Sequence, residues 1–136
     1  MEYELMKNIK VLIATALLLH TSSIYADEMK SARSEANMFA ANMVNNKFKA
    51  IAEMTHPGLV KSFGGVDEYA ASIASTYKEA DFSFKKLKFT KIGQINTSGK
   101  FAVAKFPYES LVAAGKESFE GNSFFVGFSK NKSKWY

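Results

Sequence analysis

Asp81 divides the chain into two parts in which apolar residues are spaced differently. Before it, apolar side chains recur every three or four residues, a spacing that places them on one face of an α-helix. After it, they alternate with polar residues, which is typical of half-buried β-strands. Helices followed by strands predict an α+β fold in which N-terminal helices pack on an antiparallel β-sheet.

Three helices are predicted before Asp81. The first covers about residues 31–46, and its apolar stripe consists of Ala32, Ala36, Phe39, Ala40 and Met43. The second starts near residue 48 and ends near His56, because Pro57 disfavours the helical conformation of the residue before it. Leu59, Val60 and Phe63 are expected to form an apolar turn before Gly64-Gly65. The third helix runs from about Asp67 to Ala80, with Asp67 in its first turn.

The strands that follow are predicted to form a strongly bent sheet. Phe82 and Phe84 alternate on one parity and Leu87 and Phe89 on the other, so a β-bulge is expected near residues 85–86. The alternation continues through residues 91–95. Residues 96–99 have the composition of a turn.

Three further strand segments are predicted, over residues 101–106, 111–113 and 123–128. Pro107 cannot donate a ladder hydrogen bond, so we expect it at an edge, a bulge or a strand end. Residues 134–136 start another strand. Either this last strand is very short or the gene product is truncated.

The first 26 residues have the features of a secretory signal peptide. Lys7 and Lys10 supply positive charge, Val11 to Leu19 form an apolar run, and Ala26 is the expected last residue removed. The apolar run has about half of the roughly 20 residues that span a bilayer, so we expect cleavage and no retained span. Residues 27–136 are then expected to form a single domain of a bacterial protein that is periplasmic or secreted.

Composition excludes several classes of site. The chain has no cysteine, which excludes disulfides, thiolate metal sites and cysteine nucleophiles. His56 is the only histidine after Ala26, so neither a metal nor another cofactor is expected. The net charge is +5, yet Arg33 is the only arginine, and phosphate and base recognition favours the rigid arginine fork. Nucleic acid is therefore not an expected partner.

The chain resembles the nuclear transport factor 2-like superfamily, an α+β cone in which a bent sheet wraps around a long helix and leaves a pocket. Residues 48–60 followed by Gly64-Gly65 are similar to a "Thr-aromatic-Pro-x-Leu-Val … Gly-Gly" segment of small exported bacterial members, and Lys134-Trp135 to the start of their final strand. The resemblance spans roughly residues 31–136. Superfamily members include isomerases, dehydratases, polyketide cyclases and non-enzymatic binding modules, so the resemblance implies a fold and a pocket and transfers no catalytic residue.

Many aromatic residues and few titratable ones indicate a non-enzymatic domain that binds a small apolar ligand or a protein partner. The candidate ligand-binding residues are His56, Tyr69, Tyr77, Tyr108 and Trp135. The alternative is a small isomerase-like or dehydratase-like enzyme that uses His56, Asp67 and a pocket tyrosine. For each residue a structural role competes, since His56 precedes a proline in a turn and the tyrosines have the spacing of core residues.

Two surfaces are expected to be exposed on the sheet. Phenylalanines on both faces predict a homodimer through the sheet, because monomers rarely expose large apolar patches. Lys85, Lys86, Lys88 and Lys91 form the densest basic run. The run either protects a strand edge against aggregation or attracts an anionic surface.

Overall fold

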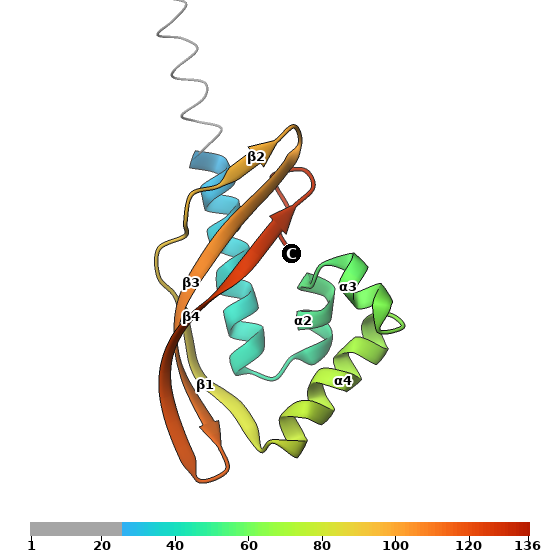
Figure 1. The fold of residues 1–136 in the computed structure, drawn as a ribbon, viewed down its shortest axis with the longest axis vertical. Helices are drawn as coiled ribbons and strands as arrows, with labels where there is room; N and C mark the ends of the chain where they lie inside the picture. The colour runs from blue at the N-terminus through green and yellow to red at the C-terminus, as the bar shows by residue number, and fades with distance from the viewer. Residues whose placement is uncertain (1–25) are drawn as a thin grey trace, which may run out of the picture.

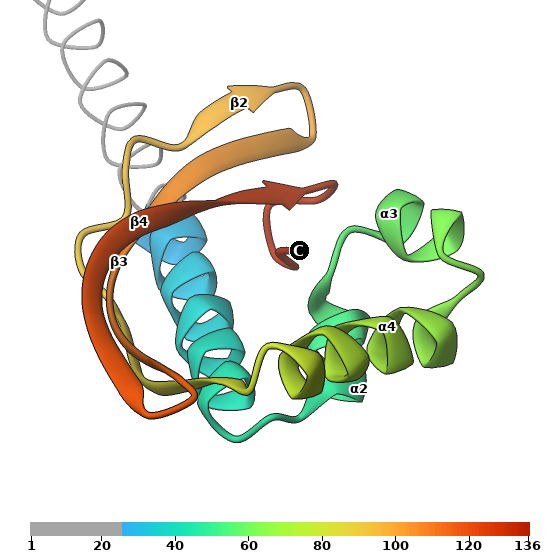
Figure 2. The ribbon, with the colours of Figure 1, turned by 60° about the horizontal axis from the view of Figure 1, so that its bottom comes forward.

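The computed structural model describes residues 26–136, so the predicted signal peptide, apart from Ala26, lies outside the described residues. The fold is α+β, as the change of spacing at Asp81 predicts. Helices occupy the first part of the chain and a four-stranded antiparallel sheet the second. The sheet curls around the N-terminal helix, and the other three helices lie on its concave side (Figures 1 and 2).

The N-terminal helix covers described residues 26–44 and buries one stripe of mostly small side chains. Ala32 and Ala36 pack with Phe106 and Trp135 in one core cluster. Ala40 and Met43 continue the stripe into a second cluster with Ile51, Phe84 and Leu87. Small side chains allow the helix to approach the sheet closely. Because its stripe contributes to both clusters, the helix connects them.

Three shorter helices follow: α2 (Phe48–Met54), α3 (Pro57–Ser62) and α4 (Val66–Glu79). Residues 59–63 were expected to form a turn, and this prediction is wrong, since most of them belong to α3. Pro57 occupies the first turn of α3, where its fixed φ suits a helix and its missing N–H is not needed. In the described part of the chain, no helix is long and apolar enough to cross a bilayer.

The sheet consists of β1 (Phe82–Phe89), β2 (Asn96–Ser98), β3 (Phe101–Ala114) and β4 (Glu117–Ser129). β3 is central: β1 and β2 pair with one side of it and β4 with the other. The predicted bulge is confirmed, because the β1–β3 register shifts between Phe84 and Lys86. β4 pairs with β3 without a shift along its whole length.

Pro107 lies inside β3, and the two segments predicted on either side of it form one continuous strand. Its carbonyl accepts a hydrogen bond from the Thr90 N–H on the β1 side, so its missing N–H faces that side as well. The ladder between β1 and β3 therefore stops near Pro107, and β1 ends at Phe89. The proline marks the end of the neighbouring strand and leaves the pairing with β4 intact.

The expected strand over residues 91–95 and the expected turn over residues 96–99 are also wrong. After β1 the chain has no regular ladder, and the Gly93 N–H donates to the Lys105 carbonyl at 2.8 Å. Ile92 and Ile95 are still buried, which accounts for their apolar character. Asn96–Ser98 forms β2, and the turn follows at the next residue, Gly99, whose φ is +58°.

The last seven residues fold back onto the N-terminal helix and β4. Ser31 donates a side-chain hydrogen bond to the Ser133 carbonyl, and Lys132 lies 3.8 Å from the buried Glu28 carboxylate. Asn131 Oδ1 accepts from the backbone N–H groups of residues 133 and 134, which fixes the turn. Residues 135 and 136 are thereby held against the sheet.

Candidate ligand-binding pocket

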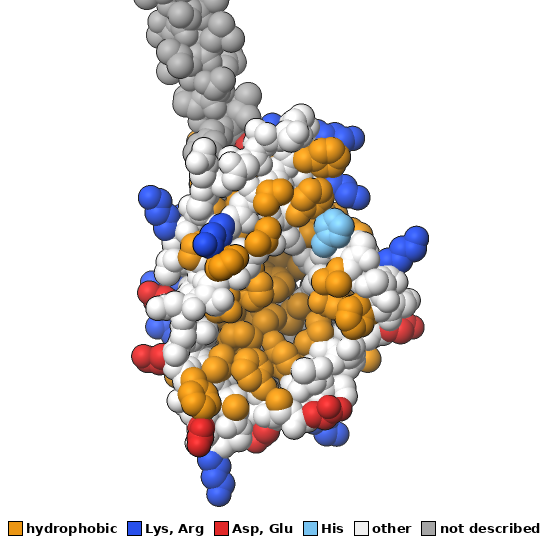
Figure 3. Space-filling view, in the orientation of Figure 1, with side chains coloured by type: hydrophobic (Ala, Val, Ile, Leu, Met, Phe, Trp, Pro, Cys, Tyr) orange, Lys and Arg blue, Asp and Glu red, His pale blue; other side chains and the backbone are white. Residues whose placement is uncertain are grey.

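A hollow of about 570 Å³ opens between the N-terminal helix, the end of β4 and the helices α2 to α4. Figure 3 shows it as a depression whose visible walls are almost entirely hydrophobic. The lining residues are Ala32, Glu35, Ala36, Phe39, Met54, Thr55, His56, Leu59, Tyr69, Phe89, Phe106, Phe125, Val126, Gly127, Phe128, Trp135 and Tyr136. The hollow lies inside the curve of the sheet, where the cone resemblance implies a pocket.

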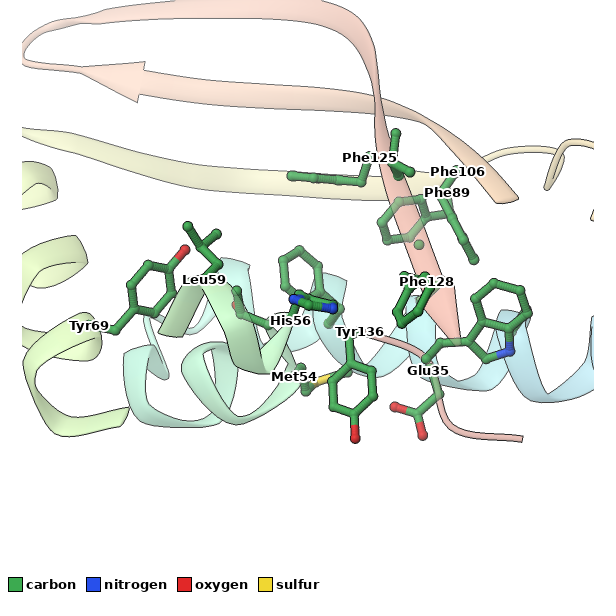
Figure 4. A pocket seen from close by; sticks show the side chains of 17 residues that line it. Glu35, Met54, His56, Leu59, Tyr69, Phe89, Phe106, Phe125, Phe128 and Tyr136 are labelled. Carbon is green, nitrogen blue, oxygen red and sulfur yellow. The ribbon is translucent and has the colours of Figure 1, made fainter. Parts of the chain in front are cut away.

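Aromatic side chains make up the sheet side of the hollow. Phe125 packs edge-on against Phe39 of the N-terminal helix, with ring centroids 5.2 Å apart. Phe106 contacts Phe89 and the indole of Trp135 in the same manner, at 6.0 and 5.7 Å. In Figure 4, Phe89, Phe106 and Phe125 come from the sheet, and Leu59 and Tyr69 from the helices opposite. Edge-to-face pairs are a preferred arrangement of aromatic rings, so these contacts stabilise the wall.

Gly127 makes room for the Phe106 ring beside the hollow. A Cβ atom at this position would lie 2.2 Å from Phe106 Cε2, far inside van der Waals contact. The residue is buried in β4, directly opposite Ala104 of β3. Glycine is required here because the Phe106 ring lies over its backbone.

His56 lies at the mouth of the pocket and caps α3. Its Nδ1 accepts a hydrogen bond from the Gly58 N–H at 3.1 Å. The ring stands edge-on to Phe128 at 5.2 Å and to Tyr136 at 6.4 Å. His56 is exposed, and its capping role explains why the chain turns sharply at His56-Pro57.

Glu35 is the one acidic residue among those that line the hollow, and it is half-buried. No lysine or arginine occurs among these lining residues. The other polar side chains there are Thr55, His56, Tyr69 and Tyr136, and the Thr55 hydroxyl already donates to the Ile51 carbonyl. The pocket is thus an apolar chamber with a single carboxylate and no cationic side chain.

Of the five residues expected from the sequence to contact a ligand, the structure brings together His56, Tyr69 and Trp135. Tyr77 and Tyr108 lie outside the lining. Tyr77 packs edge-on between Phe48 of α2 and Phe82 of β1, and Tyr108 stacks on Phe125 at 4.9 Å. Both belong to the second core cluster, which matches the competing structural role.

Asp67 does not join His56 at the pocket. Its carboxylate pairs with Lys49 at 2.9 Å, on the exposed surface near the start of α4. This hydrogen bond and the charge of Asp67 raise the pKa of the Lys49 ammonium. The His56, Asp67 and tyrosine set of the enzymatic alternative is therefore not assembled in this structure.

Sequence reasoning missed Glu35 and the residues of β4 that line the pocket. Glu35 lies three residues after Ala32 and four before Phe39, so it falls on the apolar face of its helix. A charged residue within an apolar stripe is the pattern that could have identified it. Val126 and Phe128 carry no such pattern, because their place at the pocket depends on the curvature of β4.

Two other features of the site bear on its chemistry. Among residues 26–136, no group of three or more histidine, aspartate and glutamate side chains is arranged to hold a metal ion.

Trp135 is buried, and its Nε1–H has no hydrogen-bond acceptor among the described residues. The stabilising contribution of Trp135 therefore comes from the packing of its ring against Phe106.

No protein-family model and no curated protein sequence matches the chain. Among solved structures, a Catenulispora acidiphila protein aligns with a TM-score of 0.56 at 13% identity, over 81% of this chain and 81% of that one. A C. acidiphila structure described as a complex with S-DNPA aligns with a TM-score of 0.55 at 12% identity, over 84% and 87%. At this identity the likeness shows a shared fold.

Proposed function

We propose that this protein binds a small, largely aromatic ligand in the hollow between the sheet and the helices, without catalysing a reaction. The observation that carries this proposal is the open chamber of about 570 Å³ whose walls are almost wholly apolar. Sites for small molecules are typically concave, apolar and about 300–1,000 Å³ in volume.

Burial of the exposed wall supplies the driving force for this binding. Phe39, Phe125 and Phe128 are only partly buried in the described chain although they face the hollow. Apolar surface removed from water contributes about 25 cal/mol per Å². The edge-to-face rings also hold the chamber open, so little of this free energy is spent on ordering side chains.

The polar groups of the chamber select the charge of the ligand. Glu35 is half-buried and no cationic side chain lines the hollow, so an anionic ligand would meet a like charge in a poorly solvated site. We therefore assign a neutral or cationic ligand, such as an aromatic amine. The C. acidiphila protein solved in complex with S-DNPA supports ligand binding by a domain of this fold.

Several further assignments belong to the same proposal. We place the chain in the nuclear transport factor 2-like superfamily, supported by the order of its elements and by the sheet that curves around the N-terminal helix. We assign it to the exported proteins, on the composition of its first 26 residues. The enzymatic alternative is less well supported, because Asp67 is engaged by Lys49 away from His56.

A fluorescence titration tests the proposed function. Trp135 is the only tryptophan of the chain and lines the hollow, so its emission reports on occupancy directly. Phenylnaphthylamine, a neutral apolar probe, should bind saturably and quench Trp135, and naphthylmethylamine should displace it. A probe that fails to quench Trp135, or that quenches it without saturation, would contradict the proposal.

A matched pair of variants locates the binding. Leu59 is 45% exposed and lies on the rim, so Leu59→Glu places a charge at the mouth without disturbing the core. It should weaken probe binding about tenfold, or about 1.4 kcal/mol. Ser62→Glu adds the same charge to the same helix at a position that does not line the hollow, and should leave affinity unchanged.

A further inference from the structure

β1 and β4, the two longer outer strands of the sheet, differ in how their free edges are protected. β1 carries Lys85, Lys86 and Lys88 together with the bulge, and lysines and bulges are the usual means by which natural edge strands avoid pairing. β4 is longer, at 13 residues, and contains no lysine, no proline and no shift of register. The charged residues of β4 are Glu117 and Glu120 alone, so this long edge has fewer protections than β1 and is open to strand pairing.

The free edge of β4 has a defined set of hydrogen-bonding groups. Phe128 and Tyr136 exchange two backbone hydrogen bonds, so the backbone groups of Phe128 point away from β3. Because β4 has no bulge, every second residue before Phe128 has the same orientation. These residues are Val126, Phe124, Asn122, Glu120 and Ser118. Within residues 26–136, no partner strand covers this stretch.

We propose that this edge pairs with the same edge of a second copy of the chain. The two β4 strands run antiparallel about a two-fold axis, with Asn122 of one copy opposite Asn122 of the other. This register uses all five outward-facing residues and so forms five mutually hydrogen-bonded pairs, and it stops short of the position held by Tyr136. The two sheets then form one continuous sheet of eight strands.

Charge complementarity favours this register. Glu120 of one copy stands opposite Phe124 of the other, on the same face of the joined sheet. The ammonium of Lys105 lies over the ring of that Phe124, 4.1 Å from its centroid. The two-fold axis brings each partner's Glu120 beside a Lys105 ammonium, and this contact occurs twice in the dimer.

The same register covers exposed apolar surface. Phe124 and Val126 are 49% and 63% exposed, which is unusual for large apolar side chains next to each other along one edge. In the dimer, Val126 stands opposite the partner's Ser118, and Phe124 is flanked by the methylene groups of the partner's Glu120. The edge therefore gains both backbone pairing and apolar contact.

A proline substitution tests the edge directly. Asn122 has its N–H on the free side, so Asn122→Pro removes no bond to β3 and should fold, since proline is tolerated on edge strands. Wild type should show a dimer mass in multi-angle light scattering at micromolar concentration. Asn122→Pro should be monomeric, while Asn122→Thr, which keeps the N–H, should remain dimeric. A monomeric wild type would overturn the proposal.

A second comparison separates edge pairing from packing of two sheets face to face. Val103 is 40% exposed on the face of central strand β3, away from the β4 edge. Val103→Lys should leave the edge dimer intact. A dimer that is lost in Val103→Lys and kept in Asn122→Pro would assign the interface to the sheet face and overturn the proposal.

Charge reversal tests the register. Glu120→Lys should raise the dimer dissociation constant at least tenfold, because it sets two lysines against each other at each contact. Lys105→Glu should do the same, and the double variant should restore dimerisation. If either single variant leaves the dissociation constant unchanged, or if the double variant fails to recover, the register with Asn122 on the two-fold axis is wrong.

Discussion

Phe128 and Tyr136 exchange two backbone hydrogen bonds, of 3.1 Å from the Phe128 N–H and 2.9 Å from the Tyr136 N–H. This single pair fixes the end of the chain against β4. It places Tyr136 at the mouth of the hollow and leaves Trp135 packed on Phe106. Residues 135 and 136, which follow the last strand, therefore form part of the pocket wall.

Gly127 is predicted to be intolerant of any side chain. Gly127→Ala should lower the free energy of unfolding by about 1–3 kcal/mol, because the new methyl group would displace the Phe106 ring. Gly121→Ala is the matched control on the same strand, since its nearest atom would be Ser110 Oγ at 3.8 Å. Urea denaturation measures both. Equal stability of the two variants would show that Phe106 does not lie over Gly127.

His56 is predicted to act as a helix cap. His56→Ala should destabilise the protein by about 1 kcal/mol, because the Gly58 N–H loses its acceptor. His56→Asn should retain most of the stability, since asparagine is among the best capping residues. Thermal unfolding distinguishes the two. If Asn destabilises as much as Ala, the hydrogen bond to Gly58 is not the source of the effect.

Glu35 is predicted to set the charge preference of the pocket. In wild type, naphthylmethylamine should bind more tightly than naphthoate, because the carboxylate attracts the ammonium and repels the anion. Glu35→Gln should reduce this ratio by about tenfold, equivalent to about 1.4 kcal/mol. Competition against phenylnaphthylamine gives the ratio. An unchanged ratio would remove Glu35 from the binding site.

Tyr77 is predicted to make stability fall at alkaline pH. Burial raises the pKa of its phenol above the ordinary value of about 10, with Tyr108 and Tyr69 adding to the shift. The unfolded state therefore loses this proton first as pH rises, so the contribution is present below pH 10 and is lost above it. Tyr77→Phe should reduce the drop in melting temperature between pH 9 and pH 11. An identical drop in both proteins would contradict the shift.

Local spacing predicted most of the secondary structure, including the helical stripe of Ala32 and Ala36 and the bulge after Phe84. Local spacing failed where the end of one strand depends on a residue of the neighbouring strand. Pro107 was expected at an edge, a bulge or a strand end, yet it lies within the continuous strand β3 and ends the ladder of β1, because its missing N–H faces that side. The effect depends on which strand lies on each side of β3. The spacing of residues within a single strand does not reveal this.

The site was predicted in part for a similar reason. His56, Tyr69 and Trp135 are aromatic residues near turns or ends, and all three line the hollow. Tyr77 has the same chemistry but packs between Phe48 and Phe82, and the spacing of residues in α4 does not reveal this. The curvature of the sheet brings β4 to the mouth and cannot be deduced from alternation alone.

Ligand binding in the hollow can be followed by titrating the isotope-labelled protein with naphthylmethylamine and recording NMR spectra of its N–H resonances. Trp135 is the only tryptophan, so its indole N–H gives one assignable peak. Binding in the hollow should cause saturable shifts of this indole and of the Gly127 and Phe128 amides, which all lie there. The absence of shifts, or shifts confined to residues that do not line the hollow, would show that the hollow is not the binding site.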